Sequence, residues 1–200
     1  MLRAALTTSA ALLAFVLAAC IHAPSADTQP LDRSGMAYDS VKQLDALNIS
    51  KSEVTEILKM HDAGLSDEDC IRLIRIFHAR SQAFRSGDTV GGLIQAGMSD
   101  ETILVLANLD QLGPPSGELE AMHLAGLSDA IVLEVARHRA EGKPVLSGAS
   151  LAGLKNTGLR SSTLLELARR GIPDAEANAI LSFRRHGASD AQILRRFAHS

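Results

Sequence analysis

Apolar residues recur along this chain at the spacing of short amphipathic helices. Ile71, Ile74, Phe77 and Phe84 form one such stripe, and an apolar stripe of this period lies along one face of a helix. Runs that alternate strictly between apolar and polar residues, which are typical of half-buried strands, are few. The pattern therefore predicts an all-α protein.

A four-residue motif separates the apolar stripes, and its clearest copy is Gly64-Leu65-Ser66-Asp67. A glycine in the left-handed conformation ends a helix, and the apolar residue after it packs back onto that helix. The serine caps the next helix, and an acidic first turn suits the positive end of the helix dipole. The motif therefore predicts a helix, a tight turn and a second helix. Close variants begin at Gly97, Gly126, Gly171 and Gly187, and looser ones at Asn48 and Gly158.

Alignment of these copies predicts which residues reach the core. The sixth residue after each Gly or Asn is small or apolar in every copy: Val54, Cys70, Ile103, Val132, Leu164, Ala177 and Ile193. A 13- to 16-residue interval between copies holds one helix, so the longer intervals should contain a second turn. Each has a breaker near its middle: Ser86-Gly87-Asp88, Gly113-Pro114-Pro115-Ser116 and Gly142-Lys143-Pro144.

The expected architecture is a set of tandem helical hairpins of roughly 30 residues, similar in length to known helical repeats. Ten to twelve short helices should form one domain over residues 37–200. Helices this short need packing against their neighbours to be stable. The pattern alone allows either a compact bundle or a short solenoid.

The first twenty residues have a different character. Arg3 precedes an apolar run from Ala4 to Ala19, which is the pattern of a secretory signal. The run ends in Leu17-Ala18-Ala19-Cys20, which resembles the lipobox of bacterial lipoproteins. The resemblance implies that residues 1–19 are cleaved as a signal peptide, that Cys20 carries the lipid, and that the chain is anchored to a membrane through Cys20.

The resemblance also implies a location in the bacterial cell envelope. In a diderm bacterium, Ile21 rather than Asp after the cysteine resembles the signal for the periplasmic leaflet of the outer membrane. Residues 20–36 contain Pro24 and Pro30 and lack periodicity, so they are expected to form a polar tether. A plain signal peptide and an uncleaved anchor are the alternatives, although the run is somewhat short of the roughly 20 residues of a spanning helix.

Composition and charge narrow the possible functions. The 46 % apolar content suffices for a core, whereas only 3 % of residues are aromatic, which disfavours stacking platforms for carbohydrate or single-stranded nucleic acid. Residues 20–130 carry a net charge of −9 and residues 131–200 a net charge of +5. Three arginine pairs supply much of the positive charge: Arg169 and Arg170, Arg184 and Arg185, and Arg195 and Arg196. They either offset helix dipoles or form a basic face for anionic lipid or an acidic partner.

The segment Ala96-Gly97-Met98-Ser99-Asp100-Glu101 resembles the turn of bacterial helix-turn-helix DNA-binding domains, as does the stretch from Asn48. A recognition helix must approach phosphates, and acidic residues at its start would repel them. An exported chain also meets no chromosome. We therefore expect no nucleic-acid partner.

No motif indicates catalysis, a metal or a cofactor. The histidines lack metal-ligand spacing, and no nucleophile elbow or phosphate-binding loop is present. The register of Cys70 predicts a small buried side chain rather than a reactive thiol. The acidic cluster Asp67-Glu68-Asp69 is expected to serve the start of a helix, with Ser66 and Asp69 at the spacing of a capping box.

These observations predict a non-enzymatic, lipid-anchored envelope protein that acts as a protein-interaction or scaffold module, because helical repeats build extended binding surfaces. The partner cannot be named from the sequence. A small-ligand or lipid carrier with a cavity between its helices is one alternative. A cell-wall hydrolase whose site combines distant residues is another.

Overall fold

The computed structural model describes residues 27–114 and 116–197, and this part contains twelve α-helices, one 3₁₀ turn and no strand. The expectation of an all-α protein with ten to twelve short helices is confirmed. The helices are α1 (Gln29–Arg33), α2 (Tyr38–Ala46), α3 (Lys51–Asp62), α4 (Asp67–Ala79), α5 (Gly87–Gln95), α6 (Asp100–Asn108), α7 (Ser116–Leu124), α8 (Asp129–Ala140), α9 (Gly148–Asn156), α10 (Ser161–Arg169), α11 (Ala177–Arg185) and α12 (Asp190–Arg196), with η1 at Asp174–Glu176.

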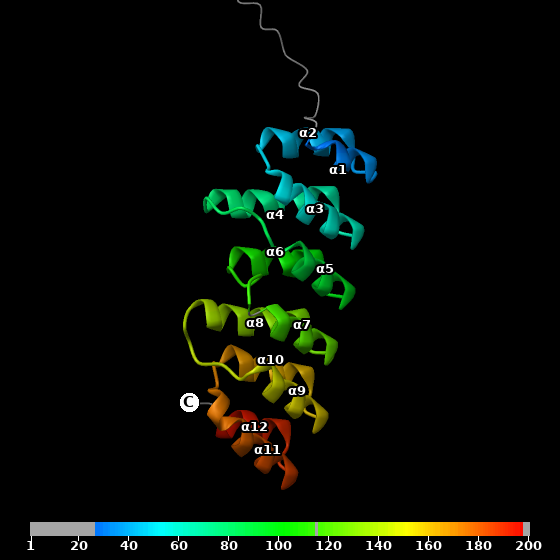
Figure 1. The fold of residues 1–200 in the computed structure, drawn as a ribbon. Coiled ribbons are helices and arrows are strands. Elements are labelled where there is room, and N and C mark those ends of the chain that lie inside the picture. Colours follow the sequence, from blue (N-terminus) through cyan, green and yellow to red (C-terminus); the bar gives the residue numbers. More distant parts are fainter. Residues whose placement is uncertain (1–26, 115, 198–200) are drawn as a thin grey trace, which may run out of the picture.

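Consecutive helices pair into six antiparallel hairpins that stack into a short solenoid (Figure 1). The odd-numbered helices pack on one another in one column and the even-numbered helices in a second column. A continuous core runs between the columns, with fully buried residues from every hairpin, such as Leu31, Ile57, Leu106, Leu151 and Ile193. The two ends of the stack lie far apart, with α1 and α2 at one end and α11 and α12 at the other.

The predicted motif closes the hairpins by local bonds. Its glycines Gly64, Gly97, Gly126, Gly158, Gly171 and Gly187 all have positive φ. Five of them close hairpins, whereas Gly171 lies in the joint between α10 and α11. At the first of them, the Gly64 N–H bonds to the carbonyl of His61 and the Leu65 N–H to that of Met60, the pattern of a Schellman motif. Leu65 is buried, and the Ser66 hydroxyl accepts the N–H of Asp69.

The folded region begins earlier than the sequence suggested. Helix α1 lies inside the tether predicted for residues 20–36, and both Leu31 and Met36 are buried. The boundary at residue 37 was therefore wrong. Pro30 was interpreted as a loop residue, but it lies in the first turn of α1, where proline is favoured because its missing N–H has no helical partner. The predicted signal peptide, Cys20 and the predicted tether up to residue 26 lie outside the described residues.

The joints between successive hairpins are more varied than the turns inside them. Positive φ falls at Asn48, Ser81, Asp110, Gly142 and Gly171 in the five joints. The breaker expected around Ser86-Gly87-Asp88 lies after the joint's left-handed residue, because Gly87 already begins α5.

The hairpins alternate in length, which reveals a larger repeat. The turn glycines are Gly35, Gly64, Gly97, Gly126, Gly158 and Gly187, and their intervals alternate between 29 residues and 32 or 33. Two hairpins together therefore form a unit of 61 or 62 residues. Some side-chain contacts recur in every hairpin, and others recur only once in each unit of two hairpins.

Candidate interaction surfaces

The motif aspartates cap helices in the neighbouring hairpin. An Oδ2 atom accepts a backbone N–H 30 residues earlier in three cases: Asp67 from Ala37 at 2.7 Å, Asp129 from Ser99 at 3.1 Å, and Asp190 from Arg160 at 3.1 Å. These three aspartates follow the two-hairpin period. In the described part of the chain, Asp100 and Ser161, which hold the same register in the intervening hairpins, make no such bond.

Two of the three borrowed caps serve helices that lack their own, whereas Ser99 also caps α6 with its own side chain. Ala37 and Arg160 are the N-cap residues of α2 and α10, and neither side chain caps its helix. Asp190 also accepts a bond from the Thr163 hydroxyl at 2.7 Å and contacts Arg184 at 3.2 Å. Burial acts to raise the pKa of Asp190, but Thr163, Arg160 and Arg184 outweigh it and hold the pKa below its usual range. The acidic first turns do serve helix starts, as predicted, but their reach into another hairpin was not foreseen. The predicted capping box of Ser66 and Asp69 is only half formed, because the Asp69 carboxylate accepts from the Ser66 hydroxyl and not from its backbone N–H.

A buried carboxylate holds the joint between the second and third hairpins. Glu53 on α3 is 3 % exposed. Its Oε1 accepts the Phe84 N–H at 3.1 Å and lies 2.8 Å from Nε2 of His78, while its Oε2 accepts the Ser50 N–H at 2.8 Å. Burial alone would raise the pKa of Glu53, but these bonds outweigh it and lower the pKa to about 2. One oxygen holds the joint through Phe84 and the other completes the capping box at the start of α3, so the arrangement indicates a structural anchor.

The remaining candidates for chemistry are also part of the fold. His61 and His123 each pair with the motif aspartate of their own hairpin, Asp67 at 3.2 Å and Asp129 at 3.1 Å. Cys70 is fully buried, as predicted, and burial raises the pKa of its thiol to about 12. Among the described residues, no group of three or more His, Cys, Asp or Glu side chains could hold a metal ion.

The structure divides the predicted basic face between two edges of the stack. Arg169 and Arg170 end α10, Arg195 and Arg196 lie at the end of α12, and both sites belong to the C-terminal edge of the even column. Arg184 and Arg185 lie at the end of α11, and because the hairpins are antiparallel this is the opposite edge. The six residues therefore form no single face.

Two of these arginines bond to backbone carbonyls. Arg170 donates to Leu194 O at 2.7 Å, and Arg184 donates to Gly158 O at 3.0 Å. Arg184 thus reaches the turn of the preceding hairpin, and Lys155 of α9 does the same, because it donates to Ala125 O at 2.9 Å in the turn between α7 and α8. This supports the interpretation that helix C-termini are being compensated. Arg185, Arg195 and Arg196 are exposed and make no ion pair or hydrogen bond within the described residues.

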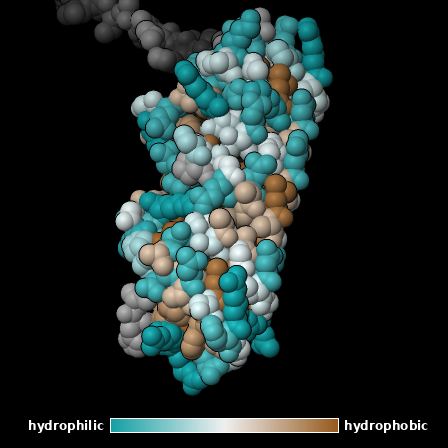
Figure 2. All heavy atoms as spheres, turned by 60° about the horizontal axis from the view of Figure 1, so that its bottom comes forward, coloured by the Kyte–Doolittle hydropathy of each residue, from teal (hydrophilic) through white to brown (hydrophobic). Residues whose placement is uncertain are grey.

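One flank of the odd column is almost uncharged. The α7–α9 face consists of the outward residues Gly117, Ala121 and Leu124 of α7 with Ala149 and Gly153 of α9. Leu124 is 66 % exposed, whereas its register position holds Asp62, Gln95, Asn156 or Arg185 in other hairpins. Figure 2 shows pale and brown atoms gathered on the right-hand side, which is the side of the odd-numbered helices in Figure 1.

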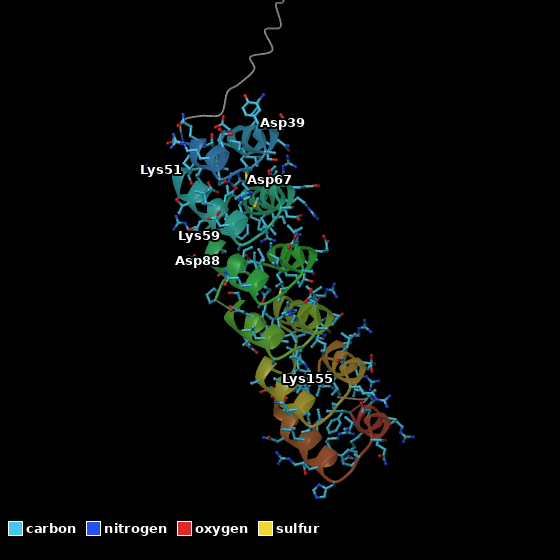
Figure 3. The ribbon with its side chains drawn as sticks, turned by 90° about the vertical axis from the view of Figure 1, so that its right-hand side faces the viewer. Asp39, Lys51, Lys59, Asp67, Asp88 and Lys155 are labelled. Atoms are coloured by element: carbon cyan, nitrogen blue, oxygen red, sulfur yellow. The ribbon has the colours of Figure 1, made fainter. Side chains whose placement is uncertain are left out.

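Farther up the same column the surface is polar. Lys59 of α3 bonds to Asp88 of α5 at 2.7 Å, and the pair is visible between successive helices in Figure 3. A hollow of about 420 Å³ lies beside this pair, lined by Asp62, Gly91 and Gln95 among others. The α7–α9 face therefore differs in charge from the rest of the odd column.

Comparison with known proteins gives no family. No protein-family model matches the chain, and no curated protein matches it either. In the part of the chain that the structure describes, no helix is long and apolar enough to cross a membrane.

Proposed function

We propose that this chain is a lipid-anchored protein of the bacterial envelope whose helical stack acts as a non-catalytic protein-interaction module. The observation that carries the proposal is the architecture: six stacked hairpins present two long columns of helices. Stacks of this kind are generally used as extended binding surfaces.

The anchor rests on the lipobox-like residues at 17–20. Helix α1 begins only nine residues after Cys20, and an extended chain spans at most about 3.5 Å per residue. The first hairpin would therefore remain within about 30 Å of the leaflet that holds the lipid. Membrane confinement raises the effective concentration of the module for partners at that surface.

The surface hollows support this proposal over a ligand carrier. Five hollows on the surface measure about 370–540 Å³, and charged or polar side chains line each of them. A lipid carrier would instead need an apolar cavity between its helices. The core positions that could line one, such as Leu73, Leu106 and Leu167, are fully buried in packed contacts.

Fatty-acid labelling in a bacterial host tests the anchor. The wild-type chain should incorporate the label, and Cys20→Ala should not; Cys70→Ala is the matched control and should label normally. Labelling of Cys20→Ala would refute lipidation at this residue.

Purification of the lipidated chain from its native envelope tests the interaction role. After crosslinking, we expect one or a few proteins to be recovered at a reproducible ratio. Repeated recovery of the chain alone would refute an interaction module.

A further inference from the structure

One solvent-facing position of the odd helices is complementary to itself when the stack is read backwards. This position lies two residues before each turn glycine and is exposed in all six hairpins. From the second hairpin to the sixth it holds Asp62, Gln95, Leu124, Asn156 and Arg185. The central residue is apolar, its two neighbours are carboxamides, and the outer two carry opposite charges. A surface that meets a second copy of itself about a two-fold axis needs this kind of self-complementarity.

The central residue of the series has no structural reason to be apolar. Leu124 is 66 % exposed, the highest value for a large hydrophobic side chain in the described part of the chain. Phe183, which is 38 % exposed, lies four residues before its turn glycine, a register that is buried in the five earlier odd helices. The register of Leu124 is instead exposed and polar in the other five hairpins. Leu124 also lies within the uncharged α7–α9 face, so the two form one continuous apolar patch of the kind found at protein interfaces.

The polar residues of the series are available to a partner. Within the described residues, no side-chain hydrogen bond or ion pair is made by Asp62, Gln95, Asn156 or Arg185. The neighbouring Arg184 shows the contrast, because it bonds to Gly158 O at 3.0 Å and so compensates a helix end. Arg185 has no such role inside the chain.

A two-fold axis parallel to α7 matches every member of the series. Such an axis reverses the order of the helices along the stack but keeps the direction of each helix, so residues of the same register meet. Helix α7 then faces α7 of the second copy, α5 faces α9, and α3 faces α11. Leu124 meets Leu124 at the centre. On either side of it Gln95 meets Asn156, and farther out Asp62 meets Arg185.

Other outward residues are compatible with the same axis. Gly92 would face Gly153 of the second copy, while Gly117 and Ala121 would face their own equivalents. No atom of the chain lies within 4 Å of a Cβ placed on Gly117 or Gly153, so this surface is open. Small residues here let facing helices approach to about 8 Å. Glu120 is a charged residue near the centre, but its Oε2 would lie 3.2 Å from a Cβ on Gly92, so its carboxylate leans toward α5 and away from the axis.

Other two-fold arrangements of this face bring unlike residues together. An axis parallel to the stack would set each helix against its own copy, so Asp62 would meet Asp62. An axis on α5 would set Leu124 against Asp62, and one between α5 and α7 would oppose Arg33 and Arg185. An axis between α7 and α9 would set Leu124 against Asn156 and would leave Asp62 without a counterpart.

The size and the charge of the surface also suit a second copy. Five stacked helices at 8–10 Å spacing extend about 40 Å, and nine-residue helices are about 14 Å long. The two copies together would bury about 1,100 Å², slightly more than the roughly 1,000 Å² expected of a specific interface. Residues 20–130 carry a net charge of −9 and residues 131–200 one of +5. Because α7 lies near this boundary, the antiparallel arrangement places the acidic part of each copy beside the basic part of the other.

We propose that the odd column binds a second copy of this chain, forming an antiparallel two-fold dimer centred on Leu124. The proposal goes beyond the proposed interaction role, since it names the chain itself as a partner and does not depend on the lipid anchor.

Disulfide crosslinking in the envelope of cells that naturally produce the full-length chain tests the position of the axis. On oxidation with copper phenanthroline, Leu124→Cys should give a species of twice the chain mass, because the two residues meet on the axis. Wild type should give none, since its Cys70 is fully buried. Asn156→Cys is the matched control at an exposed position of the same register. Its two copies would lie about 18 Å apart, too far for a disulfide, which needs Cα atoms within about 7 Å.

Co-expression of two differently tagged chains completes this test. Gln95→Cys in one chain and Asn156→Cys in the other should form a mixed disulfide, because α5 faces α9. Absence of a Leu124→Cys dimer, an Asn156→Cys dimer of equal yield, absence of the mixed disulfide, or an adduct of Leu124→Cys with a different protein would each overturn the proposal.

Charge reversal tests the outer pairs in the Leu124→Cys chain. Asp62→Arg and Arg185→Asp should each lower the yield of the dimer about 10-fold, because two like-charged pairs replace two attractive ones. Both substitutions in one chain restore opposite charges and should return the yield to within about twofold of the starting chain. Both residues are exposed, so the melting temperature should stay close to that of the wild type. A double variant as weak as the single ones would overturn the pairing of Asp62 with Arg185.

The outcomes also separate this proposal from the broader one. Other proteins recovered from the envelope without a Leu124→Cys dimer would support the interaction role and refute the dimer. A dimer with no other protein recovered would support this proposal and refute the broader one.

Discussion

The turns inside the hairpins and the joints between them share the same local backbone bonds but differ in the long-range contacts that hold them. A turn such as Gly64-Leu65-Ser66 is closed by bonds between residues at most five apart, and its serine caps the helix that follows. The joint from α4 to α5 has Ser81 in the left-handed conformation and depends on Glu53, which lies about 30 residues earlier. This joint begins with the same local bonds as the turn, because the N–H groups of Ser81 and Gln82 bond to the carbonyls of His78 and Phe77. Its later residues are held by Glu53 of α3, so the joint needs a long-range contact that the turn does not need.

The largest effect should come from removing the anchor of a joint. Glu53→Gln removes a buried carboxylate that accepts bonds from Ser50, His78 and Phe84, and we expect it to lower the free energy of unfolding by about 3 kcal/mol at neutral pH. Urea denaturation measures this change. Glu68→Gln on the exposed start of α4 is the control and should change stability by less than about 0.5 kcal/mol. Equal effects of the two substitutions would contradict the distinction between turns and joints.

The same carboxylate should make stability depend on acid. The pKa of Glu53 is lowered from 4.5 to about 2 in the fold, so its contribution is complete above pH 4.5 and is lost as pH falls toward 2. A shift of this size corresponds to about 3 kcal/mol. Urea midpoints measured between pH 6 and pH 2 should fall less steeply for Glu53→Gln than for the wild type. Parallel curves would show that Glu53 is not the group responsible.

A joint should also be sensitive to added volume. In Gly87→Ala, the new Cβ would lie 2.5 Å from the backbone oxygen of Glu56, so α5 must move away from α3, at an expected cost of about 2 kcal/mol. Gly117→Ala in α7 is the matched control, because no atom lies within 4 Å of its Cβ position. It should stabilise the protein by about 0.5–1 kcal/mol, since alanine favours the helix. Thermal denaturation of both variants measures these changes in stability. If Gly87→Ala left stability unchanged, α3 and α5 would be less closely packed than the structure shows.

One residue of the turn motif should behave like a joint residue. Asp190→Ala removes the bonds to Arg160 and Thr163 in the preceding hairpin, and we expect a loss of about 1–2 kcal/mol. Hydrogen exchange should show the lost protection at the start of α10, although the substitution lies in α12. Ser189→Ala, which removes a cap within α12 itself, should increase exchange mainly in α12. An Asp190→Ala effect confined to α12 would contradict the borrowed cap.

The smallest effects should come from the left-handed residues themselves. Gly64→Ala introduces a side chain at φ +107° and should cost about 1 kcal/mol, whereas Ser81→Gly relieves a side chain at φ +57° and should stabilise by about 0.5 kcal/mol. Chemical denaturation measures both changes in the free energy of unfolding and shows whether they have opposite signs. The same sign for both would mean that backbone conformation does not decide stability at these positions.

The features that depend on neighbours in the sequence were predictable. Helix periodicity and the Gly-apolar-Ser-Asp motif located five of the six hairpin turns in the described residues, and alignment of the motif copies assigned Cys70 to the core. The turn at Gly35 was missed, and the copies at Asn48 and Gly171 mark joints. Pro30 concealed α1 because a proline suits both a loop and a first helical turn, and only burial of Leu31 distinguishes them. The joint at Ser81 was misplaced toward Gly87 because serine carries no strong signal for the left-handed conformation.

The candidate surfaces were less predictable, because they depend on which hairpins touch. The arginine pairs look equivalent in the sequence, yet the antiparallel hairpins send Arg184 and Arg196 to opposite edges. Phe183 resembles any other core residue of its register, and its exposure follows only from its place in the last hairpin. The 30-residue interval between Ala37 and Asp67 was a usable signal for the borrowed caps, had it been compared with the intervals at Asp129 and Asp190.

The borrowed caps also constrain how the chain can change its length. Removal of the α7–α8 hairpin, for example, would place Ser99 of α6 opposite Ser161 of α10, which offers no carboxylate. Removal or addition of two consecutive hairpins, 61 or 62 residues, would keep every aspartate opposite the helix it caps. The smallest module that can be duplicated or deleted without loss is therefore a pair of hairpins, although the smallest visible repeat is one.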